Sequence, residues 1–225
     1  MPAVTFQRAR SEEQRAVRRR AILDTARAML EEMPVAALSL NELSRRVGLA
    51  KSNVLRYFES REAVLLELLD DAWREWLDSL TDALPTSDSD PPVAERTERL
   101  AAILTQTLAD RPMLCELGSA SAAVLEHNVS AAVAARFKHA ALADTVALAQ
   151  LVRRVVPELT EAAAQRFAAA TVLVTGSLWA YSRPSPAMLA AYEADPALAA
   201  MRLDFGDTVR DLLATLLAGL LARPG

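Results

Sequence analysis

The sequence predicts an all-α protein, and three observations support this. The chain has only 6 glycines among 225 residues and is rich in Ala and Leu, a composition that favours helix. No segment alternates apolar and polar residues over a run of β-branched side chains, as a half-buried strand would. Prolines divide the chain into segments of helical length, at Pro34, Pro112, Pro157, Pro184 and Pro196. We therefore expect helices joined by short connections.

The composition is that of a folded protein, with 52% hydrophobic and 24% charged residues. The polar N-terminus has no apolar signal core. The most apolar runs, 168–180 and 212–222, are shorter than the ~20 residues of a membrane span. We therefore expect a cytoplasmic protein with no membrane association.

No pattern typical of an enzyme is present. A Gly-rich phosphate loop, a nucleophile elbow and metal-spaced Cys or His sets are all absent from the sequence. The single cysteine, Cys115, excludes an intrachain disulfide and is expected to be a small buried apolar residue. We therefore expect no catalytic residues, no cofactor and no metal.

Charge is distributed unevenly along the chain. Residues 1–62 hold 12 Lys and Arg against 8 Asp and Glu, a net of +4, whereas the overall net charge is −4. Residues 63–225 hold 13 against 21, a net of −8. A basic N-terminal part on an acidic body can bind phosphate locally, which points to DNA.

The N-terminal elements follow from spacing and caps. Residues 1–10 are expected to form a flexible arm, followed by a helix over 11–32 with an apolar stripe at Ile22, Leu23, Ala26, Met29 and Leu30. Ser39 and Glu42 have the spacing of a capping box for a short helix that Gly48 ends. A second short helix is expected from about Lys51 to Phe58, and Ser60 begins a long one over 61–83.

Two short helices joined by a Gly turn and supported by a third form a helix-turn-helix. The second short helix can enter a DNA major groove. Its outward side chains are cationic, amide or hydroxyl groups suited to phosphates and base edges: Lys51, Ser52, Asn53, Arg56 and Tyr57. The alternative, a solvated face on an ordinary helical hairpin, does not account for the Gly turn and the Arg-rich flank.

The runs Ile22–Ala26, Ser39–Leu49 and Val54–Leu65 resemble the DNA-binding domain of the tetracycline-repressor-like (TetR) family. The resemblance covers about residues 18–69 and implies that Lys51–Tyr57 is the recognition helix. It also implies phosphate contacts for Ser39 and Arg61. The sequence departs from the family at Ala50, where a Ser or Thr usually caps the recognition helix, and at Leu55, where Tyr is usual.

The C-terminal part is expected to form a helical bundle for ligand binding and dimerisation. Further helices are expected near residues 93–109, 112–127, 129–156, 160–182 and 204–222. The last of these is apolar on nearly every side and must therefore pack against other helices on more than one side. The resemblance implies a four-helix dimer interface, for which the candidates are Gly176, Leu213, Leu216, Leu217 and Leu220. The alternative is a central helix buried within one subunit.

The resemblance also implies a small-molecule pocket in the bundle. The candidate pocket residues are Met113, Cys115, Leu117, His127, Phe167 and Trp179, with Asn128 and His139 as further polar candidates. Each of them alone is more often a core or surface residue than a ligand contact.

The sequence therefore predicts an arm (1–10), a helix-turn-helix domain (11–62) and a ligand-binding and dimerisation domain (63–225). The leading hypothesis is a homodimeric repressor that binds a palindromic operator in double-stranded DNA and is released by a small molecule. The helix 61–83, without Pro or Gly, is the expected mechanical link between the two domains. The alternative is a DNA-binding structural or cell-division factor of the same fold with no effector. A partly apolar pocket in the bundle would favour the first, and a filled core the second.

Overall fold

The computed structural model describes residues 3–85 and 91–223, with side chains from residue 12 onward. All regular elements of these ranges are helical. They are α1 (Ala3–Glu32), the 3₁₀ turn η1 (Val35–Ala37), α2 (Leu40–Val47), α3 (Lys51–Val54), α4 (Arg61–Ala83), α5 (Val93–Ala109), α6 (Pro112–Ser121), η2 (Leu125–Asn128), α7 (Ala131–Val155), α8 (Glu161–Tyr181), α9 (Pro186–Ala194), α10 (Pro196–Ala199) and α11 (Phe205–Ala222). Within the described ranges, no helix is both long enough and apolar enough to cross a membrane.

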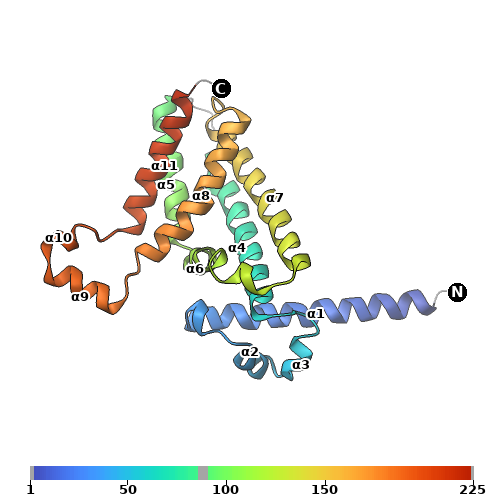
Figure 1. The fold of residues 1–225 in the computed structure, drawn as a ribbon. Helices are drawn as coiled ribbons and strands as arrows, with labels where there is room; N and C mark the ends of the chain where they lie inside the picture. Colours follow the sequence, from blue (N-terminus) through green and yellow to red (C-terminus); the bar gives the residue numbers. More distant parts are fainter. Residues whose placement is uncertain (1–2, 86–90, 224–225) are drawn as a thin grey trace.

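The helices form a head and a body (Figure 1). We call α1–α3 with their connections the head, and α4–α11 the body. α1 lies across the base with α2 and α3 beneath it, and α4 rises from the head between the helices of the body. α4 packs on α1 and on α5, α6 and α7. Its bounds match the predicted helix, and its unbroken course gives the head a direct connection to the body.

The first helix is longer than predicted. Residues 3–10, expected as part of a flexible arm, are the first turns of α1, because the chain there lacks Pro and Gly and continues in good helix formers. Met1 and Pro2 lie outside the described residues. Further along, the helix expected over 112–127 ends at Ser121, and a 3₁₀ turn follows in which Leu125 is completely buried.

Ion pairs hold α1 on α4. The Arg19 guanidinium binds the Glu67 carboxylate and the Arg27 guanidinium binds Glu75 at 2.8 Å. Arg20 lies 3.3 Å from Asp71. The apolar stripe of α1 predicted from spacing, with Ile22, Ala26 and Met29 at 0% exposure, faces the core beside these pairs. The two helices are therefore joined by apolar burial flanked by charge pairs.

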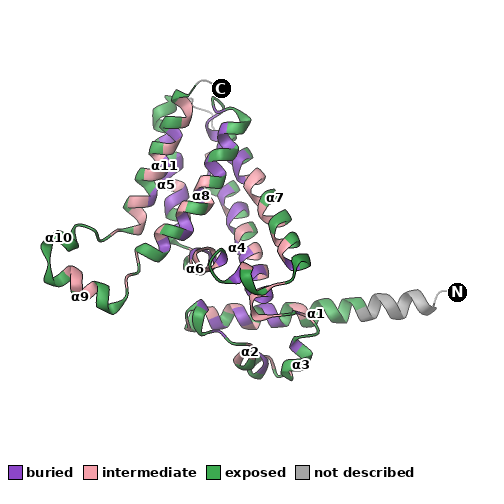
Figure 2. Cartoon of the chain, in the orientation of Figure 1, coloured by how far each residue is buried: buried purple, intermediate pink, exposed green. Residues whose placement is uncertain are grey.

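The core runs from the head into the body (Figure 2). Trp76 of α4 is its largest fully buried side chain, and its indole N–H donates to Thr107 Oγ1 at 3.0 Å. The Trp73 ring meets Trp76 edge-on at 5.0 Å between ring centroids. Trp76 is therefore part of the core, whereas Trp73 is only half-buried.

The α6–α8 crossing depends on a glycine. A Cβ at Gly176 of α8 would lie 3.1 Å from the carbonyl carbon and oxygen of Gly118 in α6. Backbone atoms cannot rotate away as a flexible side chain could. A Cβ at Gly118, in contrast, would meet no atom within 4 Å. Only Gly176 is therefore required for the close approach.

We expect Gly176→Leu to lower the free energy of unfolding by about 1–3 kcal/mol, because the added side chain forces α6 and α8 apart. Gly118→Ala is the matched control and should stabilise α6, since Ala is favoured over Gly in a helix by about 0.8–1.0 kcal/mol. Urea denaturation of both variants measures the two effects. Equal stabilities would show that the crossing tolerates the larger side chain.

Candidate nucleic-acid interface and ligand cavity

The start of α2 has half of the predicted capping box. The Glu42 backbone N–H donates to Ser39 Oγ at 3.2 Å. The Glu42 side chain does not return to Ser39 but accepts from Arg45 and Arg46 at 2.6 and 2.9 Å. These hydrogen bonds with the two guanidinium groups lower the pKa of Glu42 to about 2. Because the hydroxyl proton of the exposed Ser39 is not used for the cap, it can still be donated to a phosphate.

The turn into α3 is made as predicted, but α3 is shorter. Gly48 has φ +70°, a left-handed conformation that favours glycine. Regular α-helix ends at Val54. The predicted remainder up to Phe58 forms turns with hydrogen bonds over three residues, such as that from the Tyr57 N–H to the Val54 carbonyl at 2.9 Å. Ala50 supplies no side-chain cap, which is a physical reason for the short helix. Val54 and Phe58 are buried, as their spacing predicted.

Most of the predicted DNA-binding residues lie in α3 and the turns after it, Lys51–Tyr57, which we call the recognition segment. Lys51, Ser52, Asn53 and Arg56 are exposed, and Tyr57 is half-buried. Leu55, where the family usually has Tyr, is 41% exposed. A concave surface between α1 and the segment after α3 is lined by Gln14, Arg15, Arg18, Leu49, Asn53, Arg56 and Tyr57.

Two arginines of α1 extend this surface beyond the predicted set. Arg15 and Arg18 are exposed and form no ion pair within the described part of the chain, whereas Arg19 and Arg20 are paired with α4. The sequence has four clustered arginines, Arg15, Arg18, Arg19 and Arg20. It does not show which of them point toward the segment Lys51–Tyr57. Helical position separates them, because residues one apart lie about 100° around the helix.

Arg61, for which the resemblance implied a phosphate contact, has partners within the chain. Its guanidinium donates to the backbone carbonyl of Leu38 at 3.1 Å, and its Nε lies 3.3 Å from the Glu62 carboxylate. The side chain is 21% exposed. In this conformation Arg61 ties the start of α4 to the chain before α2.

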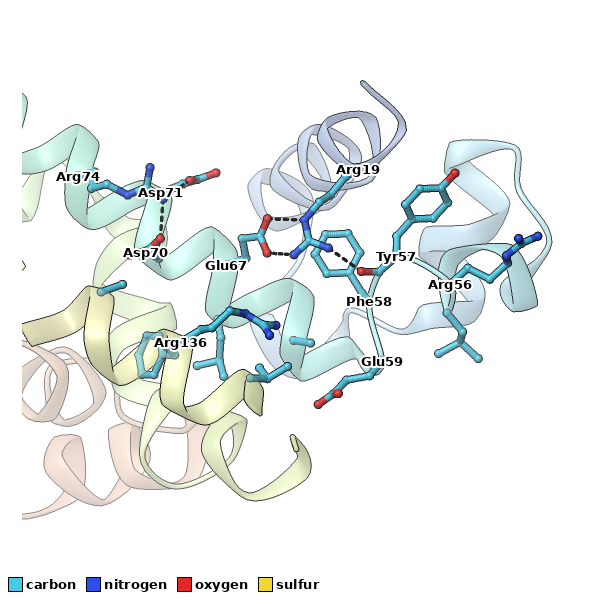
Figure 3. A pocket seen from close by; sticks show the side chains of 16 residues that line it. Arg19, Arg56, Tyr57, Phe58, Glu59, Glu67, Asp70, Asp71, Arg74 and Arg136 are labelled. Carbon is cyan, nitrogen blue, oxygen red and sulfur yellow. Dashed lines mark hydrogen bonds and ion pairs between the residues drawn. The ribbon is translucent and has the colours of Figure 1, made fainter. Parts of the chain in front are cut away.

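Arg19 fixes the end of the recognition segment (Figure 3). Its guanidinium lies over the Phe58 ring at 4.1 Å from the centroid and donates to the Tyr57 carbonyl at 2.6 Å. The same group donates to Glu67 at 2.9 Å. One side chain of α1 thus connects the recognition segment to α4.

A cavity of about 560 Å³ lies among α4, α6, α7 and α8. Its size falls in the range of small-molecule sites. Its lining is largely apolar and includes Trp73, Phe137, Leu148, Val172 and Leu173, and it also holds Asp70, Glu126, Lys138 and Asp144. The body therefore has a hollow of the predicted kind.

The residues predicted for the pocket are not those that line this cavity. Cys115, Leu117, Phe167 and Trp179 are buried at 4% exposure or less. Met113 is half-buried against the core, and His127 is exposed on η2. Burial raises the pKa of the Cys115 thiol to about 12, consistent with its expected role as an inert core residue. The apolar character of these side chains is explained by their place in the core, and other residues form the cavity wall.

Several predicted interface residues also face their own subunit. Leu213 and Leu217 are completely buried, and Gly176 packs on α6. Leu216 and Leu220 are only partly buried. On the adjacent helix α8, Leu173 and Tyr181 are 71% and 73% exposed. The apolar surface available to a partner therefore includes α8 side chains that the sequence did not single out.

Comparison with known proteins agrees with this architecture. Residues 22–68 match the model of bacterial regulatory proteins of the tetR family, and residues 70–224 match the model of a tetracyclin repressor-like C-terminal domain. A TetR transcriptional regulator from Rhodococcus sp. RHA1 has a similar fold, with a TM-score of 0.57 at 15% identity over 96% of this chain and 100% of that chain.

Curated relatives match the N-terminal part. The HTH-type transcriptional regulator EthR of Mycobacterium tuberculosis (strain ATCC 25618 / H37Rv) is 46% identical over 50 residues, which are 22% of this chain and 23% of the relative. EthR of Mycolicibacterium smegmatis is 34% identical over 79 residues, 35% of this chain and 36% of the relative. The matches thus span little more than a third of these relatives at most. Since the family models cover both head and body, the chain belongs to the TetR family of DNA-binding transcriptional regulators.

Proposed function

We propose that this chain is a homodimeric repressor that binds a palindromic operator through the head and is released when a small molecule occupies the cavity of the body. The observation that carries the proposal is the coexistence of an exposed basic recognition face and a partly apolar cavity, joined by α4. Ser39, Lys51, Ser52, Asn53, Arg56 and Tyr57 would contact DNA, and Arg15 and Arg18 would add phosphate contacts.

Electrostatics supports this assignment. Lys51 and Arg56 are exposed on the recognition face and form no ion pair within the described residues. The body carries the net negative charge of the chain and would be repelled by DNA. DNA should therefore approach from the head alone.

Lys51→Ala should weaken binding to all DNA sequences alike. Each lost phosphate contact reduces the slope of log K against log[salt] by about 0.9, so the slope should become less steep. Arg61→Ala should leave the slope unchanged but lower the free energy of unfolding by about 1–3 kcal/mol, because the Leu38 carbonyl loses a charged donor. Salt titrations of DNA affinity, with thermal unfolding, separate the two variants. A flattened slope for Arg61→Ala would instead assign Arg61 to a phosphate.

The dimer is supported by the surface of the body. Leu173 and Tyr181 of α8, which also line the cavity, are largely exposed, and α11, which packs on α8, presents partly exposed Leu216 and Leu220. Two copies related by a two-fold axis would cover this face and present two recognition segments about 34–36 Å apart, the spacing of successive major grooves.

The cavity favours a ligand-responsive regulator over a structural DNA-binding factor. A factor without an effector would have a filled core at this place, whereas the bundle here has a cavity of about 560 Å³ with a partly apolar lining, as a small-molecule site requires. The cavity adjoins both α4 and α6, the elements that also contact the head. Occupancy can therefore influence the head.

A tethered occupant tests the release without knowledge of the effector. Ala141 of α7 lines the cavity, and Ala143 of the same helix is exposed and does not line it. Ala141→Cys alkylated with N-benzylmaleimide should lose operator affinity, whereas alkylated Ala143→Cys should not. The native Cys115 is buried with a raised thiol pKa and should not react. Unchanged affinity in the Ala141→Cys adduct would support the structural factor.

A further inference from the structure

The aromatic groups of the cavity are suited to a cation. Trp73 of α4, Phe137 of α7 and Tyr181 of α8 line it from three helices, and the Lys138 ammonium already lies 5.5 Å from the centroid of the Phe137 ring. Tyr181 is 73% exposed, so the half-buried Trp73 is the ring best placed for a desolvated cation. The faces of aromatic rings carry partial negative charge and attract ammonium groups, most strongly when these are desolvated. The remaining apolar lining would accept a hydrocarbon portion of the same molecule.

Asp70 is the charged side chain that α4 contributes to the lining of the cavity. It shares one guanidinium, that of Arg74, with Asp71, at 2.5 and 2.7 Å. Asp71 also lies 3.3 Å from Arg20, which is itself paired with Asp24. The carboxylates of Asp70, Asp71 and Asp24 thus share the guanidinium groups of Arg74 and Arg20, and of these groups only Asp70 lines the cavity. One oxygen of Asp70, Oδ1, is buried without a hydrogen-bond partner.

Asp144 of α7 adds a second carboxylate to the lining. It is half-buried and forms no hydrogen bond or ion pair within 4 Å among the described residues. Burial, and then the charge of Asp70, raise the pKa of Asp144 to about 6. Burial and the charge of Asp70 make the ionised form of Asp144 unfavourable, and a cation bound beside the carboxylate would offset this penalty.

The other charged pair in the cavity is neutral overall. Glu126 accepts from Lys138 at 2.8 Å and from Ser121 Oγ at 3.0 Å. The only lysine of the lining is therefore already matched by a carboxylate. An anionic ligand would find no unmatched cation there and would face Asp70 and Asp144.

We propose that the effector bound in this cavity is a lipophilic cation, an amine or quaternary ammonium carried on an apolar or aromatic body, with its charge placed between Asp144 and Asp70 and its apolar part against Trp73 and Phe137. The inference rests on the proposed function only in taking the cavity as the effector site. It specifies a ligand charge that the fold by itself does not.

Three probes built on one phenylbutyl chain test the charge: a trimethylammonium, a neutral dimethylamide and a sulfonate. By calorimetry, the full-length protein should bind the ammonium at least about tenfold more tightly than the amide, and the sulfonate most weakly. Asp144→Asn should lose the preference for the ammonium over the amide. Asp78→Asn, an exposed position of α4 outside the lining, should keep it.

The preference should also depend on pH. Lowering the pH from about 7.5 to about 5 protonates Asp144, so ammonium affinity should fall while amide affinity stays constant. The charged and titratable groups facing Asp144 are Asp70 and Arg74 of α4, Glu126 of η2, Lys138 of α7 and Tyr181 of α8. Asp144→Asn should therefore remove the pH dependence, which a purely structural role of Asp144 would leave in place.

Equal or stronger binding of the amide or the sulfonate, binding of none of the three probes, or a preference that survives in Asp144→Asn would overturn the cation assignment. The proposed function is judged separately, by the uncharged tethered occupant. If that occupant releases DNA and the ammonium shows no preference, the regulator stands and the ligand class is wrong. If the preference holds and the occupant has no effect on DNA, the cation site stands and release by ligand does not.

Discussion

Asn53→Ala is expected to erase base preference at one position of each operator half-site. Asn53 is exposed near the centre of the recognition face, and its amide can form two hydrogen bonds with one adenine. Loss of a good bidentate pair costs about 1–3 kcal/mol of discrimination, and a dimer loses two pairs, so the total is about 2–6 kcal/mol. Binding-site selection from random DNA measures this directly.

Arg56→Ala should act in the same way at a different position, where guanine is the expected base. Ser52→Ala is the control on the same face, because a single hydroxyl reads bases less specifically. Affinity for unrelated DNA should change little in Asn53→Ala, since the amide contributes no charge. An unaltered consensus from the selection would remove Asn53 from base readout.

The head was predictable because its signals are local. A side-chain cap at Ser39, a left-handed Gly48 and apolar residues one helical turn apart act over a few residues. The prediction was wrong about the length of α3, where the absence of a cap at Ala50 and the tight bonds after Val54 prevailed over helical periodicity. The orientation of Arg61 depends on the Leu38 carbonyl, 23 residues away, which spacing does not reveal.

The cavity was not predictable at the level of residues, because it depends on how α4, α6, α7 and α8 cross. Phe167 and Trp179 are as apolar as a pocket wall would be, yet both pack within the core. Asp144 and Asp70, the carboxylates between which we propose a bound cation, resemble ordinary surface acids in the sequence. The exposure of side chains on α8 was likewise not predictable from the sequence, because the exposed Leu173 and the buried Gly176 are separated by less than one turn.

The structure also revises how the cavity should communicate with the head. The helix α4 is the connection expected from sequence, but two hydrogen bonds join head and body elsewhere. The Val35 N–H of η1 donates to Glu116 Oε1 of α6 at 2.7 Å. The Ser130 N–H at the start of α7 donates to Glu59 Oε1 at 2.5 Å, which lowers the pKa of Glu59. Both α6 and α7 line the cavity.

Glu116→Ala is therefore expected to reduce the effect of a cavity occupant on DNA. Coupling between two sites is typically about 1–3 kcal/mol, or 5- to 150-fold in affinity, and if α6 transmits most of it, the variant should lose most of that factor. The measurement is operator affinity of the Ala141→Cys protein before and after alkylation, with and without Glu116→Ala. Glu116→Gln should preserve the coupling, because its amide oxygen can still accept from Val35.

Stability must be followed in the same samples. Val35 is 4% exposed, so an unpaired N–H there costs about 1–3 kcal/mol, and affinities should be measured well below the unfolding midpoint. A folded Glu116→Ala variant that binds DNA and retains the full alkylation effect would mean that α6 is not the route. The unbroken α4 would then carry the movement alone, by displacing the recognition segment that Arg19 ties to Glu67. In that case Arg19→Ala, and not Glu116→Ala, should uncouple the occupied cavity from the operator.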